Sequence, residues 1–262
     1  MKKDVLEGFK QYFHDEIVQI EQIREYFQNF YENLSESSFL WRIYELKRAG
    51  VITKLSSSIY RINQYRKKDF QVEFKGFPQI FDVLKNMNSA VMKNKYVSSD
   101  ELFMSAWDIS ILNQFMTHQV LKDIIVIEGD KYRLPSIYDE LKTQLNSTFF
   151  VSRNPKKDVD NLSYENEIVF VLPLPKRSPI DKSNAITTQY IVVPKMEKIL
   201  VDLVANQELT PMIDSYTVKE IMMNFYKEYN LDFTTLLYYA RNRGIRDKMA
   251  EIVNWATGEA LK

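Results

Sequence analysis

The stretch Ser35-Glu-Ser-Ser-Phe-Leu-Trp-Arg-Ile-Tyr-Glu-Leu-Lys-Arg-Ala-Gly50 decides the expected fold of the N-terminal part. Its apolar residues recur at the spacing of one helix face, and they are Phe39, Leu40, Ile43 and Leu46. Gly50 follows at the position where a left-handed residue commonly ends a helix. The pattern therefore predicts an amphipathic helix that stops at a glycine.

Two short strands are predicted directly after that glycine. Residues 51–55 and 58–62 alternate between apolar and polar side chains, as half-buried strands do, and Ser56 and Ser57 form a polar turn between them. Upstream, residues 19–27 predict another helix, which a short loop joins to the first. Helix, loop, helix, glycine and hairpin together predict a winged helix-turn-helix, whose second helix enters a DNA major groove.

Composition allows a second, larger domain and excludes several kinds of chemistry. The chain has 262 residues, of which 45% are hydrophobic, so it has enough apolar residues to bury a sizeable core. It has no cysteine and two histidines, which excludes disulfides and Cys-ligated zinc and disfavours His-rich metal sites. We therefore expect no catalytic residue, no cofactor and no metal site.

The net charge and the hydropathy of the chain limit where the protein is located in the cell and which partners it can bind. The formal net charge is zero at pH 7, which neither favours nor opposes site-specific DNA binding. No apolar run approaches the roughly 20 residues that span a bilayer, and the first residues lead into an amphipathic helix and not into an apolar signal. We expect a cytoplasmic protein without a membrane partner.

The polar and basic run at residues 64–69 predicts a linker, which divides the chain into a winged-helix domain at residues 1–68 and a larger domain at 69–262. The larger domain alternates strands with helices and then becomes wholly helical. Strands are predicted at residues 101–107, 124–127, 148–151, 168–172 and 190–193. Helices are predicted at residues 77–92, 109–116, 135–141, 194–205, 215–229, 233–242 and 244–257.

The expected fold class is thus α/β in the broad sense (α+β). It comprises an N-terminal winged helix-turn-helix, a mixed sheet and a C-terminal helical cluster. The three prolines of residues 173–179 predict a long surface loop between the last two strands.

The segment Pro194-Lys-Met-Glu-Lys-Ile-Leu-Val-Asp-Leu203 is the most distinctive motif outside the winged helix. One interpretation is that Glu197, Lys198 and Asp202 form a functional site. The alternative, which the spacing favours, is a helix start at Pro194 with Glu197 near the positive helix end and a surface pair of Lys198 and Asp202.

Together, this motif, the winged helix and the late segment Tyr239-Ala-Arg-Asn-Arg-Gly244 resemble the AbiEi-type proteins, antitoxins and transcriptional regulators of type IV toxin-antitoxin systems. The sequence has Met196 where that family often has leucine. The resemblance implies a bacterial regulator that binds operator DNA upstream of its own operon. It also implies a functional partner, a nucleotidyltransferase-like toxin that the protein counteracts without forming an obligatory complex.

The expected DNA contacts lie on the second helix and on the wing. The side chains away from the apolar stripe and at the tip of the hairpin are Ser37, Ser38, Trp41, Arg42, Lys54, Ser56 and Ser57. Arg42 is suited to a guanine edge or a phosphate, and the two helix serines are suited to phosphates. The alternative is a winged helix that contacts only proteins, with Trp41 buried.

Basic residues in the Pro-rich loop and near the C-terminus form a second candidate surface, for nucleic acid or an acidic partner: Lys176, Arg177, Arg241, Arg243, Arg246 and Lys248. The alternative is an ordinary solvated face, diluted by Asp247 and Glu251.

An enzyme is the remaining alternative. Glu128 and Lys131 follow a buried strand, as the acidic residue and lysine of some metal-dependent nucleases do. Gly129 and Asp130 between them form a common turn pair, and a turn is the favoured interpretation.

Overall fold

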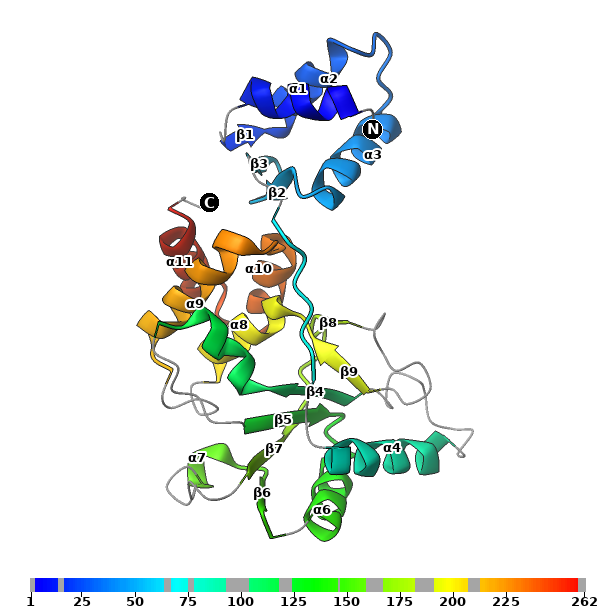
Figure 1. Cartoon of the computed structure of the whole chain (residues 1–262), viewed down its shortest axis with the longest axis vertical. Helices are drawn as coiled ribbons and strands as arrows, with labels where there is room; N and C mark the ends of the chain where they lie inside the picture. The colour runs from blue at the N-terminus through cyan, green and yellow to red at the C-terminus, as the bar shows by residue number, and fades with distance from the viewer. Residues whose placement is uncertain are drawn as a thin grey trace.

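The N-terminal part of the computed structural model is a winged helix (Figure 1). The structure describes residues 3–13, 17–63, 67–74, 78–92, 104–117, 124–145, 147–158, 167–181, 191–206 and 213–258. The winged helix contains α1 (Lys3–Phe13), β1 (Ile17–Gln19), α2 (Ile20–Gln28), α3 (Glu36–Arg48), β2 (Ile52–Lys54) and β3 (Ile59–Ile62). Its three strands are antiparallel in the order β1-β3-β2. The sequence prediction of a winged helix is confirmed, although the sequence did not indicate β1.

Local sequence explains how α3 begins and ends. Ser35 caps its first turn by accepting a hydrogen bond from the Ser38 amide at 3.3 Å. Gly50 has φ +66°, which L side chains rarely adopt, and so lets the chain turn sharply into β2. The buried face of α3 consists of Phe39, Ile43 and Leu46. The prediction that Leu40 belongs to this face is wrong, since its side chain is 51% exposed. Leu40 follows Phe39 directly and therefore points about 100° away from it around the helix axis.

The larger domain is built on a mixed sheet of six described strands in the order β6-β7-β5-β4-β9-β8. The strands are β4 (Met104–Asp108), β5 (Ile124–Gly129), β6 (Phe149–Ser152), β7 (Glu167–Pro173), β8 (Ile180–Asp181) and β9 (Ile191–Pro194). β5, β6 and β7 run parallel to one another, β4 is antiparallel to β5, and β4 is parallel to β9. The mixed-sheet prediction is confirmed. The first part of the strand predicted at 101–107 lies outside the described residues.

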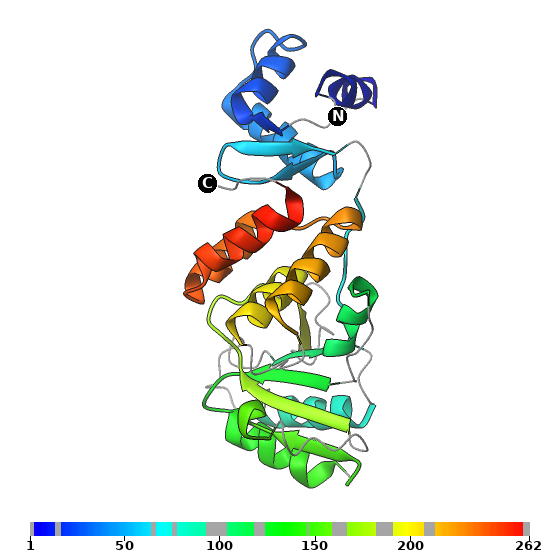
Figure 2. The same cartoon turned by 90° about the vertical axis from the view of Figure 1, so that its left-hand side faces the viewer.

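Helices cover both faces of the sheet (Figures 1 and 2). One face packs on α4 (Pro78–Met92) and α6 (Leu134–Gln144). The other face packs on α8 (Met196–Ala205), and behind it stand α9 (Ser215–Glu228), α10 (Phe233–Asn242) and α11 (Arg246–Thr257). The 3₁₀ helix η1 (Ile109–Phe115) and the short α7 (Pro155–Asp158) lie in connections. The predicted C-terminal helical cluster is therefore confirmed.

The sheet alternates its side chains between these two helical layers. On β5, Ile125 and Ile127 belong to the core beneath α4 and α6, whereas Ile124 and Val126 belong to the core that contains α8. Since successive strand residues point to opposite faces, Glu128 has the same orientation as Ile124 and Val126. Its carboxylate is therefore directed toward α8.

The hairpin of the winged helix lies against the C-terminal helices (Figure 2). Leu55, just beyond β2, is buried in the same core as α8 and α9. Where the chain continues, the Lys68 amide donates to the Glu228 carbonyl and the Asn230 amide donates to the Lys68 carbonyl, both at 2.9 Å. Of the predicted linker, residues 64–66 lie outside the described part, and Lys68 is held against the end of α9.

The turn between α10 and α11 gives the first testable prediction. Gly244 has φ +71°, and a Cβ atom there would meet nothing within 4 Å, so a side chain would add backbone strain without a clash. Gly244→Ala is expected to lower the free energy of unfolding by about 1 kcal/mol. Gly244→Asn should lose less, because asparagine tolerates the left-handed region better. Urea unfolding measures both, and an alanine variant as stable as the wild type would contradict this assignment.

None of the described helices is long and apolar enough to cross a membrane.

Candidate functional site

The second helix of the helix-turn-helix, α3, exposes an apolar row. Leu40 is 51%, Trp41 52% and Tyr44 59% exposed, and Ser37 precedes them on the same side of the helix. These positions follow the spacing i, i+3, i+4 and i+7, which places their side chains next to one another along α3. The predicted exposure of Ser37, Ser38 and Trp41 agrees with the structure, and only the burial of Trp41 that accompanied the protein-contact alternative is wrong.

Arg42 is directed away from that row. Its guanidinium lies 4.0 Å from the centre of the Tyr31 ring and donates to the Ser38 carbonyl at 3.0 Å. Tyr31 lies in the connection between α2 and α3, so the Arg42 side chain packs against the turn of the helix-turn-helix. Arg42 therefore holds the two helices together and is only half-exposed.

The predicted wing residues differ in their exposure. Ser57 is exposed at the tip, whereas Lys54 and Ser56 are half-buried. Burial here follows from the neighbouring Leu55, which anchors the hairpin in the core of the larger domain. Of the three predicted wing contacts, Ser57 has the most accessible side chain.

The second group of interest is a buried ionic cluster, which we define as Glu128, Lys198, Asp202, Tyr239 and Arg243. The Lys198 ammonium donates to both carboxylate oxygens of Glu128, at 2.6 and 2.7 Å, and to Oδ2 of Asp202 at 2.7 Å. Asp202 also accepts from the Tyr239 hydroxyl at 3.0 Å, and a nitrogen of Arg243 lies 3.3 Å from its Oδ1. The cluster joins β5, α8 and the end of α10.

Two cationic and two anionic groups meet in this cluster, so its formal charges balance. Glu128, Lys198 and Asp202 are all at most 5% exposed. Burial alone would lower the pKa of Lys198, but the adjacent carboxylates of Glu128 and Asp202 outweigh it and hold the pKa above its ordinary value. Lys198 therefore stays charged, and each of its three N–H groups has an acceptor.

Burial also raises the pKa of the Glu128 carboxyl and of the Tyr239 hydroxyl. Desolvation raises the pKa of Glu128, an effect that the Lys198 ammonium opposes and the Asp202 charge reinforces. The pKa of the Tyr239 hydroxyl is raised by burial and by the charge of Asp202, so it remains a donor.

The structure corrects three sequence interpretations here. Pro194 ends β9, and α8 begins at Met196, so Pro194 is not the first residue of the helix. Lys198 and Asp202 are buried and not a surface pair, because α8 is enclosed between the sheet and the helices behind it. Glu128 and Gly129 belong to β5, and the turn predicted there begins after Gly129.

The enzyme interpretation paired Glu128 with Lys131, which the structure does not bring together in an ion pair. Glu128 contacts Lys198, whereas the Lys131 ammonium lies 4.7 Å from the ring of Tyr132 in the turn after β5. Among the described residues, no group of three or more His, Cys, Asp or Glu is arranged to hold a metal ion.

The basic residues predicted to form one surface differ in what their side chains contact. Arg243 faces inward, where it contacts Asp202 and donates to the Asn206 side chain at 3.0 Å. Arg177 reaches from the Pro-rich loop to the Tyr238 hydroxyl of α10 at 2.9 Å. The remaining basic side chains of the patch are exposed, namely Lys176, Arg241, Arg246 and Lys248.

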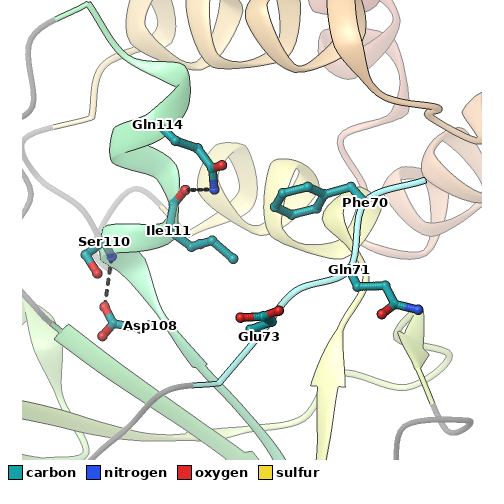
Figure 3. A pocket seen from close by; sticks show the side chains of 7 residues that line it. All are labelled: Phe70, Gln71, Glu73, Asp108, Ser110, Ile111 and Gln114. Atoms are coloured by element: carbon teal, nitrogen blue, oxygen red, sulfur yellow. Dashed lines mark hydrogen bonds between the residues drawn. The ribbon is translucent and has the colours of Figure 1, made fainter. Parts of the chain in front are cut away.

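Sequence reasoning did not indicate a cavity of about 410 Å³ beside the segment that leaves the winged helix (Figure 3). Its lining combines carboxylate, amide, hydroxyl and apolar side chains from this segment, from the end of β4 and from η1: Phe70, Gln71, Glu73, Asp108, Ser110, Ile111 and Gln114. Asp108 caps η1 by accepting from the Ser110 amide at 2.8 Å. The cavity thus lies where the segment runs along the sheet domain.

Glu197 offers a test of how strongly this core disfavours charge. Its carboxylate accepts from the Asp232 amide at 2.9 Å, and burial raises its pKa. A raised pKa means that the ionised form opposes folding at neutral pH and that this cost fades as the pH falls toward the ordinary value of the carboxyl. Glu197→Gln keeps an acceptor oxygen and is expected to stabilise the protein at pH 8. Its advantage should shrink toward pH 4 in urea unfolding, and an advantage independent of pH would contradict this.

Fold and surface together define a protein with an N-terminal winged helix, whose helix α3 has an exposed outer face, followed by an α/β domain with a buried ionic cluster. The chain belongs to DUF6577, a family of unknown function, whose model matches residues 38–259. The match begins within α3, so it includes most of that helix, the wing and the larger domain. No curated protein matches the chain.

Proposed function

We propose that this protein is a sequence-specific DNA-binding autoregulator, which reads an operator upstream of its own operon with α3. The observation that carries the proposal is the winged helix, in which α3 is the second helix of a helix-turn-helix and has an exposed outer face. The winged helix also carries basic side chains: Arg48 is exposed at the end of α3, 3.7 Å from the Glu45 carboxylate, and Lys54 is half-buried on the wing. They are placed to neutralise phosphates beside the groove.

Variants of single basic residues test this proposal. Arg42→Ala removes the contacts that hold α3 against the connection to α2, so it is expected to weaken binding to the upstream DNA by tenfold or more. Lys85→Ala is the matched control, since it removes one exposed positive charge from α4, in the other domain. Fluorescence anisotropy with a labelled duplex measures both. Equal affinities for the two variants would contradict the proposed role of α3.

The proposal extends to an antitoxin of a type IV toxin-antitoxin system, on the resemblance to AbiEi-type proteins. Two of the three features that carry this resemblance, the segments 194–203 and 239–244, meet in the folded chain, because Tyr239 and Arg243 both contact Asp202. The functional partner would be a nucleotidyltransferase-like toxin encoded nearby. The resemblance of these motifs is what supports this role.

Co-expression tests the antitoxin role separately from DNA binding. Expression of the neighbouring nucleotidyltransferase-like protein should arrest growth, and this chain, supplied from an independent promoter, should restore it. Arg42→Ala should restore growth as well as the wild type, because the contacts that it removes lie within the winged helix and not in the larger domain. Growth arrest that the wild-type chain does not relieve would overturn the antitoxin role.

A second candidate function is a winged helix that binds a protein. The exposed apolar row on α3 favours it, because contiguous exposed apolar side chains often mark protein interfaces. A net charge of zero is equally compatible with a protein partner. Equal and weak binding to the upstream and scrambled duplexes would favour this second function.

A further inference from the structure

We infer that α3 recognises thymine methyl groups, and therefore an A·T-rich operator, and does not recognise guanine through Arg42. This inference rests on the proposed DNA-binding function and specifies what the same helix reads. It starts from the side chains that α3 presents outward, which are Ser37, Leu40, Trp41 and Tyr44.

The chemistry of this row limits which bases it matches. Guanine is usually read by Arg or Lys, adenine by Asn or Gln, and cytosine by Glu or Asp. The row from Ser37 to Tyr44 contains none of these residue types. Its apolar surface matches the C5-methyl group of thymine, which is the apolar feature that bases show in the major groove.

Arg42, the residue of the N-terminal half of α3 that is chemically suited to guanine, is already engaged. Its guanidinium stacks on Tyr31 and bonds the Ser38 carbonyl, and reaching a base would require both contacts to break. The stacking of a cation on an aromatic ring stabilises this position. Arg42 is therefore a positioning residue for α3.

Two positive side chains near the row can reach phosphates. Arg48 is exposed at the end of α3, one turn beyond Tyr44 and 3.7 Å from the Glu45 carboxylate, and Lys54 is half-buried on the adjoining hairpin. An apolar row flanked by positive side chains matches a groove whose floor carries methyl groups and whose edges carry phosphates. This arrangement favours duplex DNA over a protein with an apolar surface, which would gain nothing from the flanking cations.

The test begins with selection of binding sites from a random pool of duplexes. The enriched core is expected to be A·T-rich. Thymines of that core are then replaced by deoxyuridine, which removes only the methyl group. Each contacted methyl should contribute about fourfold to affinity in anisotropy titrations, from the transfer free energy of one buried carbon group.

A thermodynamic cycle that combines the deoxyuridine replacement with a protein variant tests whether Trp41 is the side chain that contacts the methyl groups. In Trp41→Ala, the loss of affinity caused by deoxyuridine should shrink, because the partner of the methyl groups is gone. Trp255→Ala is the matched control: Trp255 is 46% exposed on α11, so this variant should retain the full deoxyuridine effect.

The outcomes separate the inference from the proposed function. Specific binding that deoxyuridine does not weaken, or a G·C-rich selected core, would overturn methyl recognition while leaving a DNA-binding protein. Failure to enrich any sequence would overturn both. The comparison of thymine with deoxyuridine uses the wild-type chain and so does not depend on the folding of a variant.

Discussion

Lys198→Met is expected to lower the free energy of unfolding by about 3–5 kcal/mol. The substitution replaces the ammonium with an apolar side chain and leaves the carboxylates of Glu128 and Asp202 buried without their shared donor. Removing one partner of a buried ion pair is strongly destabilising because the remaining charge has lost its compensation. Urea unfolding followed by tryptophan fluorescence measures the loss, since Trp107 is buried in the same core.

Lys195→Met is the matched control for this prediction. Lys195 precedes α8 and is exposed, so the same chemical change there should stay within about 0.5 kcal/mol of the wild type. A Lys198→Met variant that is as stable as this control would show that the cluster does not hold the domain together.

The loss in Lys198→Met should depend on pH. Without the ammonium, burial and mutual repulsion keep the pKa of the Glu128 carboxyl above its ordinary value, so the folded state binds protons more tightly than the unfolded chain. Stability of the variant should therefore rise as the pH falls from 8 toward 5. A constant deficit over this range would mean that the carboxylates are hydrated in the variant.

Asp202→Asn is expected to cost about 3 kcal/mol, since its carboxylate joins Lys198, Tyr239 and Arg243. The amide keeps the shape of the side chain, but it removes the negative charge between two cations. It also cannot accept hydrogen bonds on its nitrogen. The expected result is a lower urea midpoint with an unchanged denaturant slope.

A double-mutant cycle tests whether Tyr239 acts through Asp202. Tyr239→Phe alone should lose about 1–2 kcal/mol, because its hydroxyl donates to a buried charge. The same change should lose less in the Asp202→Asn background. Tyr238→Phe is the control on the same helix: Tyr238 is 51% exposed and its hydroxyl accepts from the exposed Arg177, so its loss should matter little. Strict additivity of the first two substitutions would contradict the contact.

Local signals explain why the winged helix could be predicted. The glycine at position 50, the alternation of the hairpin and the apolar face of α3 are each set within a few residues. β1 was missed because it has three residues and exists through its pairing with β3, which is distant in sequence. The position of Arg42 was also unpredictable, since it depends on the Tyr31 ring.

The ionic cluster could be predicted only in part. The spacing of Lys198 and Asp202 shows that they share one face of a helix, but their burial follows from α9 and α10 packing behind α8. Two signals were present in the sequence. Glu128 lies two and four residues after Val126 and Ile124, so it points to the same side of the strand as they do. The residues of α8 after Lys198 are nearly all apolar, as in a buried helix.

The central claim, that α3 reads a specific DNA sequence, is tested most directly by comparing two duplexes. The wild-type chain is titrated by fluorescence anisotropy against its upstream DNA and against a scrambled duplex of equal length and composition, between about 50 and 200 mM salt. We predict binding to the upstream duplex that is tighter by about 10³-fold or more and weakens as salt rises. Equal affinity for the two duplexes at every salt concentration would contradict the claim.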